Sequence, residues 1–180
     1  GWPDGSTTGA VQDDESSVIS VYLPFPTTES AGSITGAVSI AGVLPVAVEL
    51  ALASSSPADL HVPATVMIPA GGMSANFTAQ IVDDALPETT ESVTVTASAA
   101  ALTSGNGLTF ITDNDPSGFV FSSVPASWIR SVPNAVTITA VGVGGGTMAS
   151  FNGAATLSAA GDGGSVSMTP AASGSFALGM

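Results

Sequence analysis

Apolar and polar residues alternate with a period of two through most of this chain. The clearest example is segment 46–53, in which one set of alternate positions is the more apolar: Val46, Val48, Leu50 and Leu52. Such alternation is typical of a β-strand with one buried face. The pattern recurs, between clusters of Gly, Pro, Ser or Asp, over residues 19–23, 34–40, 66–68, 77–81, 93–97 and 108–110, where Leu108 and Phe110 are the apolar positions. Short strands at this spacing predict an all-β fold built as an antiparallel β-sandwich.

A second series of strands begins after residue 115. Pro116, Ser117 and Gly118 mark the break, and further strands are expected over 119–121, 135–140, 155–157 and 166–168. We therefore predict two tandem antiparallel sandwiches, over residues 18–115 and 116–180, with 1–17 as a linker or the end of a preceding module. Because the second series has no obvious closing strand, we expect it to be completed by missing sequence or by a strand from another chain.

Acidic residues gather in the turns between the predicted strands. Asp83 and Asp84 precede Glu88 and Glu91, and the run 113–115 (Asp-Asn-Asp) follows about twenty residues later. Turn oxygens collected at one end of a domain suit Ca²⁺, which takes six to eight oxygen ligands. With one His and no Cys, the chain lacks the ligands for zinc, copper or iron–sulfur sites. Solvated turns are the alternative, since Asp favours turns, but Glu88 and Glu91 are poor turn formers.

The charge balance excludes several classes of partner. Fourteen acidic residues stand against a single Lys or Arg, for a net charge of −13. Nucleic acid and anionic lipid both require basic side chains for binding, so neither is expected as a partner. The most apolar window, residues 34–53, contains Pro45 and Glu49 and predicts two strands rather than a membrane span. Because the chain has no initiating Met and no leader sequence, we expect it to be a piece of a longer protein.

Residues 18–115 resemble a Calx-beta module, the sandwich of the regulatory domains of sodium–calcium exchangers and of many large bacterial surface proteins. The resemblance is carried by residues 28–32 (Thr-Glu-Ser-Ala-Gly), 66–71 (Val-Met-Ile-Pro-Ala-Gly), 81–91 and 113–115. It implies a calcium site, with the number of ions left open, and a set of ligands. These are side-chain oxygens of Asp84, Glu88, Glu91, Asp113 and Asp115, the carbonyl of Leu86, help from Asp83 and Asn114, and the weaker positions Glu29 and Asp59. Asp59 departs from the family pattern, because Leu60 follows it where the family has an aromatic residue and the alignment needs a one-residue gap.

The region after residue 116 resembles an immunoglobulin-like module of bacterial surface proteins. The matching stretches are 119–121 (Phe-Val-Phe), 136–140 (Val-Thr-Ile-Thr-Ala) and 150–158. This resemblance implies spacing or adhesion rather than chemistry.

No catalytic constellation is present in the sequence. His61 is the only imidazole and lacks a nucleophile and an orienting acid, and the glycine run 142–146 lacks the Lys of a phosphate-binding loop. We therefore expect not an enzyme but a structural calcium-binding module of a secreted or cell-surface bacterial protein, such as an adhesin, stalk or filament component. The expected partners are neighbouring modules, copies of itself, or a cell-surface or matrix ligand. A calcium sensor and a self-assembling filament subunit remain as alternatives.

Overall fold

The computed structural model describes residues 18–122, 127, 132, 135–161, 164–165 and 173–176. Regular structure in these residues is β, apart from one turn of 3₁₀ helix, η1 (Glu29–Ala31). None of the described helical structure is long or apolar enough to cross a membrane. The strand expected over 166–168 lies outside the described residues.

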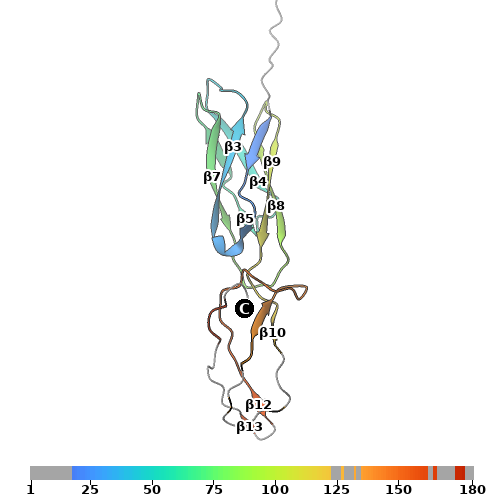
Figure 1. The fold of residues 1–180 in the computed structure, drawn as a ribbon. Coiled ribbons are helices and arrows are strands. Elements are labelled where there is room, and N and C mark those ends of the chain that lie inside the picture. The colour runs from blue at the N-terminus through green and yellow to red at the C-terminus, as the bar shows by residue number, and fades with distance from the viewer. Residues whose placement is uncertain are drawn as a thin grey trace, which may run out of the picture.

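Two facing sheets form the larger part of the molecule (Figure 1). One sheet has four strands, in the order β1 (Ile19–Tyr22), β3 (Ser33–Ile40), β7 (Ser74–Ile81) and β5 (Leu60–His61). The other has five, in the order β2 (Thr27–Thr28), β9 (Gly105–Thr112), β8 (Glu91–Ser98), β4 (Val48–Ser54) and β6 (Thr65–Ile68). This arrangement confirms the predicted all-β sandwich.

The structure differs from the predicted strands in two details. Besides the antiparallel strands, it contains the short strand β2, which the alternation did not predict and which pairs in parallel with β9. Strand β4 begins at Val48, and Val46 is 65% exposed in the connection that follows Pro45. Two residues are too few to show a period of two, which is why β2 left no signal in the sequence.

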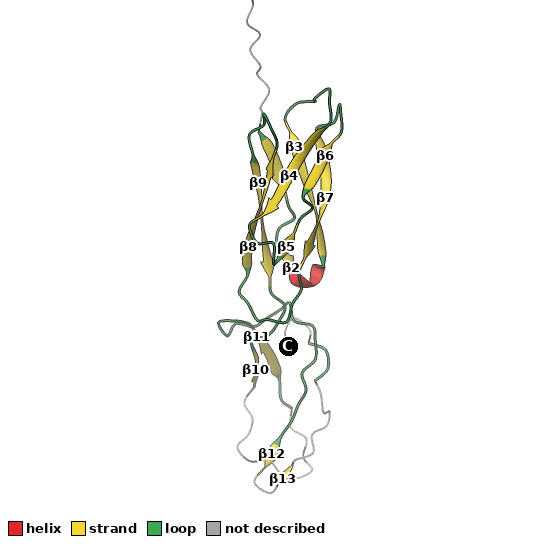
Figure 2. Ribbon diagram, turned by 180° about the vertical axis from the view of Figure 1, so that it is seen from behind, coloured by secondary structure: helices red, strands yellow, loops and turns green. Residues whose placement is uncertain are grey.

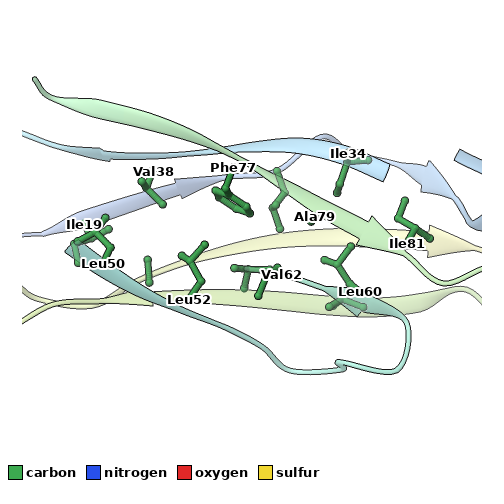
Figure 3. Close-up of a cluster of buried hydrophobic side chains, with 14 of the residues drawn as sticks. Ile19, Ile34, Val38, Leu50, Leu52, Leu60, Val62, Phe77, Ala79 and Ile81 are labelled. Carbon is green, nitrogen blue, oxygen red and sulfur yellow. The ribbon is translucent and has the colours of Figure 1, made fainter. Parts of the chain in front are cut away.

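The core lies between the sheets and is filled by the alternate apolar residues of each strand. Figure 3 shows Ile34, Val38 and Phe77 from one sheet pointing toward Leu50 and Leu52 from the other. Leu50 is completely buried. Burial of one such side chain contributes about 1.5–3 kcal/mol relative to exposure, so this core holds the two sheets together.

Strand β9 faces the other way from the sequence prediction. Leu108 is 48% exposed rather than buried, and the inward positions are Gly105, Gly107, Thr109 and Ile111. Because side chains alternate along a strand, a shift of one position exchanges the two faces. The apolar character of Leu108 and Phe110 therefore misidentified the inner face.

The glycines of β9 explain why this inner face carries so little side chain. A Cβ atom at Gly105 would lie 1.8 Å from the carbonyl oxygen of Ile19, and one at Gly107 would lie 2.9 Å from that of Val21. Strand β1 therefore passes against β9 so closely that only glycine fits at these two positions. The neighbouring inward residue, Thr109, is buried with its hydroxyl donating to the carbonyl of Pro24 at 2.7 Å.

Beyond one end of the sandwich, β10 (Gly118–Phe121) pairs with β11 (Ile138–Val141), and β12 (Ala160–Gly161) with β13 (Gly164–Ser165) (Figure 2). Strand β10 confirms the strand expected over 119–121, whereas the strand expected over 135–140 begins only at Ile138. Residues 155–157 form no continuous strand in the described structure, although Thr156 forms a β-bridge and Ala155 exchanges hydrogen bonds with Ser173. Ala155 packs with Ala140 and Phe176 in a small separate cluster. The boundary at 116–118 and the immunoglobulin-like fold of this segment stay predictions.

Candidate metal centre

Helix η1 carries Glu29 into the end of the sandwich that faces β10 (Figure 2). The β-branched pair Thr27–Thr28 favours the extended strand β2, and Gly32 ends the helical turn at φ +68°, a region that favours glycine. Thr27 lies beside Ile111 and Thr28 beside Thr112 in the parallel pair of β2 and β9. Because parallel strands leave a sheet at the same end, Glu29 and Asp113 emerge together.

A second acidic loop meets η1 at the end of β7. The N–H of Ile81 donates to the carbonyl of Gly32 at 3.0 Å, which fixes the start of the following loop against the turn of Glu29. Asp83 and Asp84 follow directly. Three segments distant in the sequence thus bring their acids to one end of the sandwich.

Glu29, Asp83 and Asp115 form the centre of this end. One carboxylate oxygen from each lies within 4.8 Å of those of the other two. Glu29 is only 6% exposed, Asp115 is half-buried and Asp83 is open to solvent. The site therefore has a buried floor and an exposed mouth.

Asn114 lies against two of these carboxylates. In one orientation of its amide, the nitrogen donates to Glu29 Oε2 at 3.3 Å and to Asp83 Oδ1 at 3.2 Å. Asn114 therefore links Glu29 and Asp83 within this end of the sandwich.

Asp113 organises the site rather than opening toward its mouth. It is 3% exposed, and its two carboxylate oxygens accept N–H donors from Glu88 at 2.8 Å and from Asp115 at 2.6 Å. In contrast, Asp115 Oδ2 is buried and has no hydrogen-bond partner among the described residues. A buried carboxylate oxygen without a donor is costly, and a bound cation is the kind of partner that would satisfy it.

Burial and neighbouring negative charges raise the pKa values of Glu29, Glu88 and Asp115. Burial, and then the charges of Asp113, Asp84, Asp115 and Glu88, raise the pKa of Glu29 to about 7. Burial followed by Asp113, Asp83 and Asp84 raises the pKa of Asp115, and burial followed by Asp84, Asp59, Glu91 and Asp113 raises that of Glu88. The chain's single Lys or Arg is Arg130, outside the described residues, so none of those residues offers either side chain for an ion pair here.

The remaining sequence-predicted ligands surround this centre. Asp84 accepts the N–H of Leu86 at 2.7 Å, and Asp59 accepts the hydroxyl of Ser56 while its carbonyl accepts the N–H of Val82 at 3.0 Å. Glu91 opens β8 beside Ile111. We refer to the full set as the acidic end: Glu29, Asp59, Asp83, Asp84, Glu88, Glu91, Asp113 and Asp115.

The structure changes the relative weight of these residues. Sequence reasoning placed Glu29 and Asp83 at the margin of the site, whereas the fold places both in the central trio with Asp115. For Glu29 the missing signal was the parallel pairing of β2 with β9, which a strand of two residues could not reveal in the sequence. An oxygen-only donor set of this kind fits a hard divalent cation such as Ca²⁺.

No protein-family model and no curated protein sequence matches this chain. Solved structures that resemble it include CBD12 from CALX1.2, with 17% identity, a TM-score of 0.43, and coverage of 58% of this chain and 48% of that one. The apo-form Calx CBD1 domain has 16% identity and a TM-score of 0.43 over 54% of this chain and 99% of that one. The calcium-binding domain CBD12 of CALX1.1 has 17% identity and a TM-score of 0.43 over 57% of this chain and 47% of that one. The chain thus spans about half the length of the two CBD12 structures, and at these values their function does not transfer to it.

Proposed function

We propose that this chain is a structural calcium-binding module of a secreted or cell-surface bacterial protein, without enzymatic activity of its own. Calcium bound at the acidic end would neutralise the crowded carboxylates and stiffen the joint with the segment that follows Asp115. The observation that carries the proposal is the convergence of Glu29, Asp83 and Asp115 from three separate loops.

Two further features support a cation over a solvated acidic surface. Glu29 is buried, whereas an acidic residue of a solvated turn would lie exposed to water. In addition, Asp115 Oδ2 lacks a hydrogen-bond donor among the described residues. Because the unfolded chain does not bring these loops together, the free energy of cation binding adds to the stability of the folded state.

A thermal melt with and without calcium tests this proposal. Free calcium at about 100 times its Kd would stabilise the folded protein by about 2.7 kcal/mol. For a domain of this size the melting temperature would then rise by on the order of 10 °C. Magnesium is expected to give a smaller rise, because it prefers a smaller octahedral site that retains waters.

Charge-removing variants locate the site. Asp83→Asn and Asp115→Asn keep the shape of the side chain, and each is expected to remove most of the calcium-dependent rise. Glu49→Gln is the matched control, because Glu49 is exposed on β4 and is not part of the acidic end. A melting temperature that calcium leaves unchanged in the unaltered chain would refute the proposal.

Self-assembly is a second candidate function, favoured by the exposed apolar residues of β10. Val120 is 54% and Phe121 50% exposed, and among the described strands β10 pairs with β11 alone. An open strand edge with apolar side chains is a template for another chain. Size-exclusion chromatography over a range of concentrations would show assembly, and a monomer at every concentration would count against it.

A further inference from the structure

Asp113 makes a third contact, which joins the acidic end to the segment beyond it. Its carboxylate accepts the N–H groups of Glu88 and Asp115, and its main-chain carbonyl accepts the hydroxyl of Ser150 at 2.8 Å. One buried residue thus holds the loop before β8, its own turn, and a loop more than thirty residues later.

The loop that carries Ser150 is anchored to β11. The N–H of Met148 donates to the carbonyl of Ala140 at 2.9 Å, Thr147 bridges to Val141, and the Met148 side chain is buried. The N–H of Phe151 donates to the carbonyl of Met148 at 3.3 Å and closes the turn around Ser150. A shift of Ser150 therefore displaces this sheet rather than a free loop.

The contact between Ser150 and Asp113 lies at an open crevice. This crevice, of about 450 Å³, is lined by Thr89, Thr90 and Thr112 of the sandwich and by Val143, Thr147 and Met148 of the segment beyond it. The hydrogen bond from Ser150 lies at this crevice, beside the covalent connection through Pro116 and the bond from the Ser117 hydroxyl to the carbonyl of Val141 at 3.0 Å. At this crevice the two sides are therefore not packed tightly against each other.

We infer that Ser150 is the positioning residue through which cation occupancy at the acidic end sets the orientation of the β10–β11 sheet. This inference rests on the proposed calcium site. A cation beside Asp115 would fix the turn of residues 113–115, and with it the carbonyl of Asp113 to which Ser150 donates. Without the cation, repulsion within the acidic end loosens that turn and the acceptor of Ser150 moves with it.

Distance measurement between two spin labels tests the inference on the full chain. The chain has no cysteine, so Asn76→Cys on β7 and Thr156→Cys beyond the joint provide two exposed and unique attachment points. In the otherwise unaltered chain, calcium is expected to narrow the distribution of distances between the labels. In Ser150→Ala this narrowing is expected to be lost, although calcium still raises the melting temperature.

Two further variants separate positioning from a general loss of structure. Ser150→Thr retains the hydroxyl and is expected to restore the narrowing, and Ser158→Ala removes an exposed hydroxyl and is expected to leave it unchanged. If Ser150→Ala binds calcium and its distribution of label distances narrows as much as that of the unaltered chain, the role of Ser150 is overturned while the calcium site stands. If the unaltered chain shows neither a melting shift nor narrowing with calcium, the calcium site itself fails, and the coupling fails with it.

Discussion

At the scale of single residues, the acidic end combines groups that differ in what they do. Both carboxylate oxygens of Asp113 accept hydrogen bonds from backbone N–H groups, so this side chain holds two loops in place. Glu29 is also buried, and its pKa is raised first by that burial and then by the charges of the surrounding carboxylates. A buried carboxylate thus acts as a structural acceptor at position 113, whereas at position 29 its charge is disfavoured by its surroundings.

The raised pKa of Glu29 predicts how stability depends on pH in calcium-free buffer. Its folded pKa of about 7 lies above its ordinary value of 4.5, so the folded state holds this proton more tightly than the unfolded chain does. The resulting stability is complete below pH 4.5 and is lost as the pH rises through about 7. Melting temperatures measured between about pH 5 and 8 should therefore fall, with a loss on the order of 1–3 kcal/mol.

The variant Glu29→Gln tests whether this pH dependence arises from the titration of Glu29. The variant cannot titrate at this position, so its melting temperature is expected to decline less over the same pH range. Glu49→Gln, on the side of the sandwich, should keep the full decline. A decline of equal size in Glu29→Gln would assign the effect to other carboxylates.

At the scale of elements, close packing of β1 against β9 decides which face of β9 is buried. Gly105 and Gly107 leave no side chain between the strands, so the backbone of β1 occupies the space that a larger residue would need. Leu108 and Phe110 consequently lie on the outer surface, where Phe110 meets Phe25 with ring centroids 5.1 Å apart.

Gly105→Ala is expected to destabilise the sandwich strongly. Its Cβ would lie 1.8 Å from the carbonyl oxygen of Ile19, so β1 must shift as a whole, at a cost of about 3 kcal/mol or more. Gly146→Ala is the matched control, because a Cβ there meets nothing within 4 Å. Urea unfolding measures both, and a loss below about 1 kcal/mol for Gly105→Ala would show that β1 does not lie this close.

At the scale of the whole molecule, charge and core are segregated. Between residues 18 and 122, every acidic residue except Glu49 belongs to the acidic end, and the sides of both sheets are otherwise uncharged. The core between the sheets is built of apolar side chains (Figure 3). Repulsion is therefore concentrated where the chain passes from one segment to the next.

This segregation predicts that salt stabilises the calcium-free protein. Raising sodium chloride from about 0.01 to 0.5 M shortens the screening length from about 30 Å to less than 10 Å. The melting temperature is expected to rise by a few degrees as repulsion weakens, on the order of 1 kcal/mol. The melting temperature of a double variant, Asp84→Asn with Glu88→Gln, should rise less with salt. If the melting temperature of the unaltered chain does not depend on salt, the acidic residues do not oppose folding.

The sequence by itself determined the fold class and the presence of the acidic end. Alternation in segments such as 34–40 and 77–81 predicts strands, because a period of two is a local property of the extended backbone. Clustered acids and the absence of cysteine indicate a hard cation for an equally local reason, the chemistry of the donor atoms.

Only the tertiary structure decided which acids meet and which face of β9 is buried. Glu29 meets Asp115 through the parallel pairing of β2 with β9. It meets Asp83 through the hydrogen bond from Ile81 to Gly32, and Ser150 reaches Asp113 across 37 positions of sequence. Leu108 is exposed because β1 fills the space beside the glycines. These are contacts between distant segments, and their geometry depends on how the sheets pack rather than on any pattern within one strand.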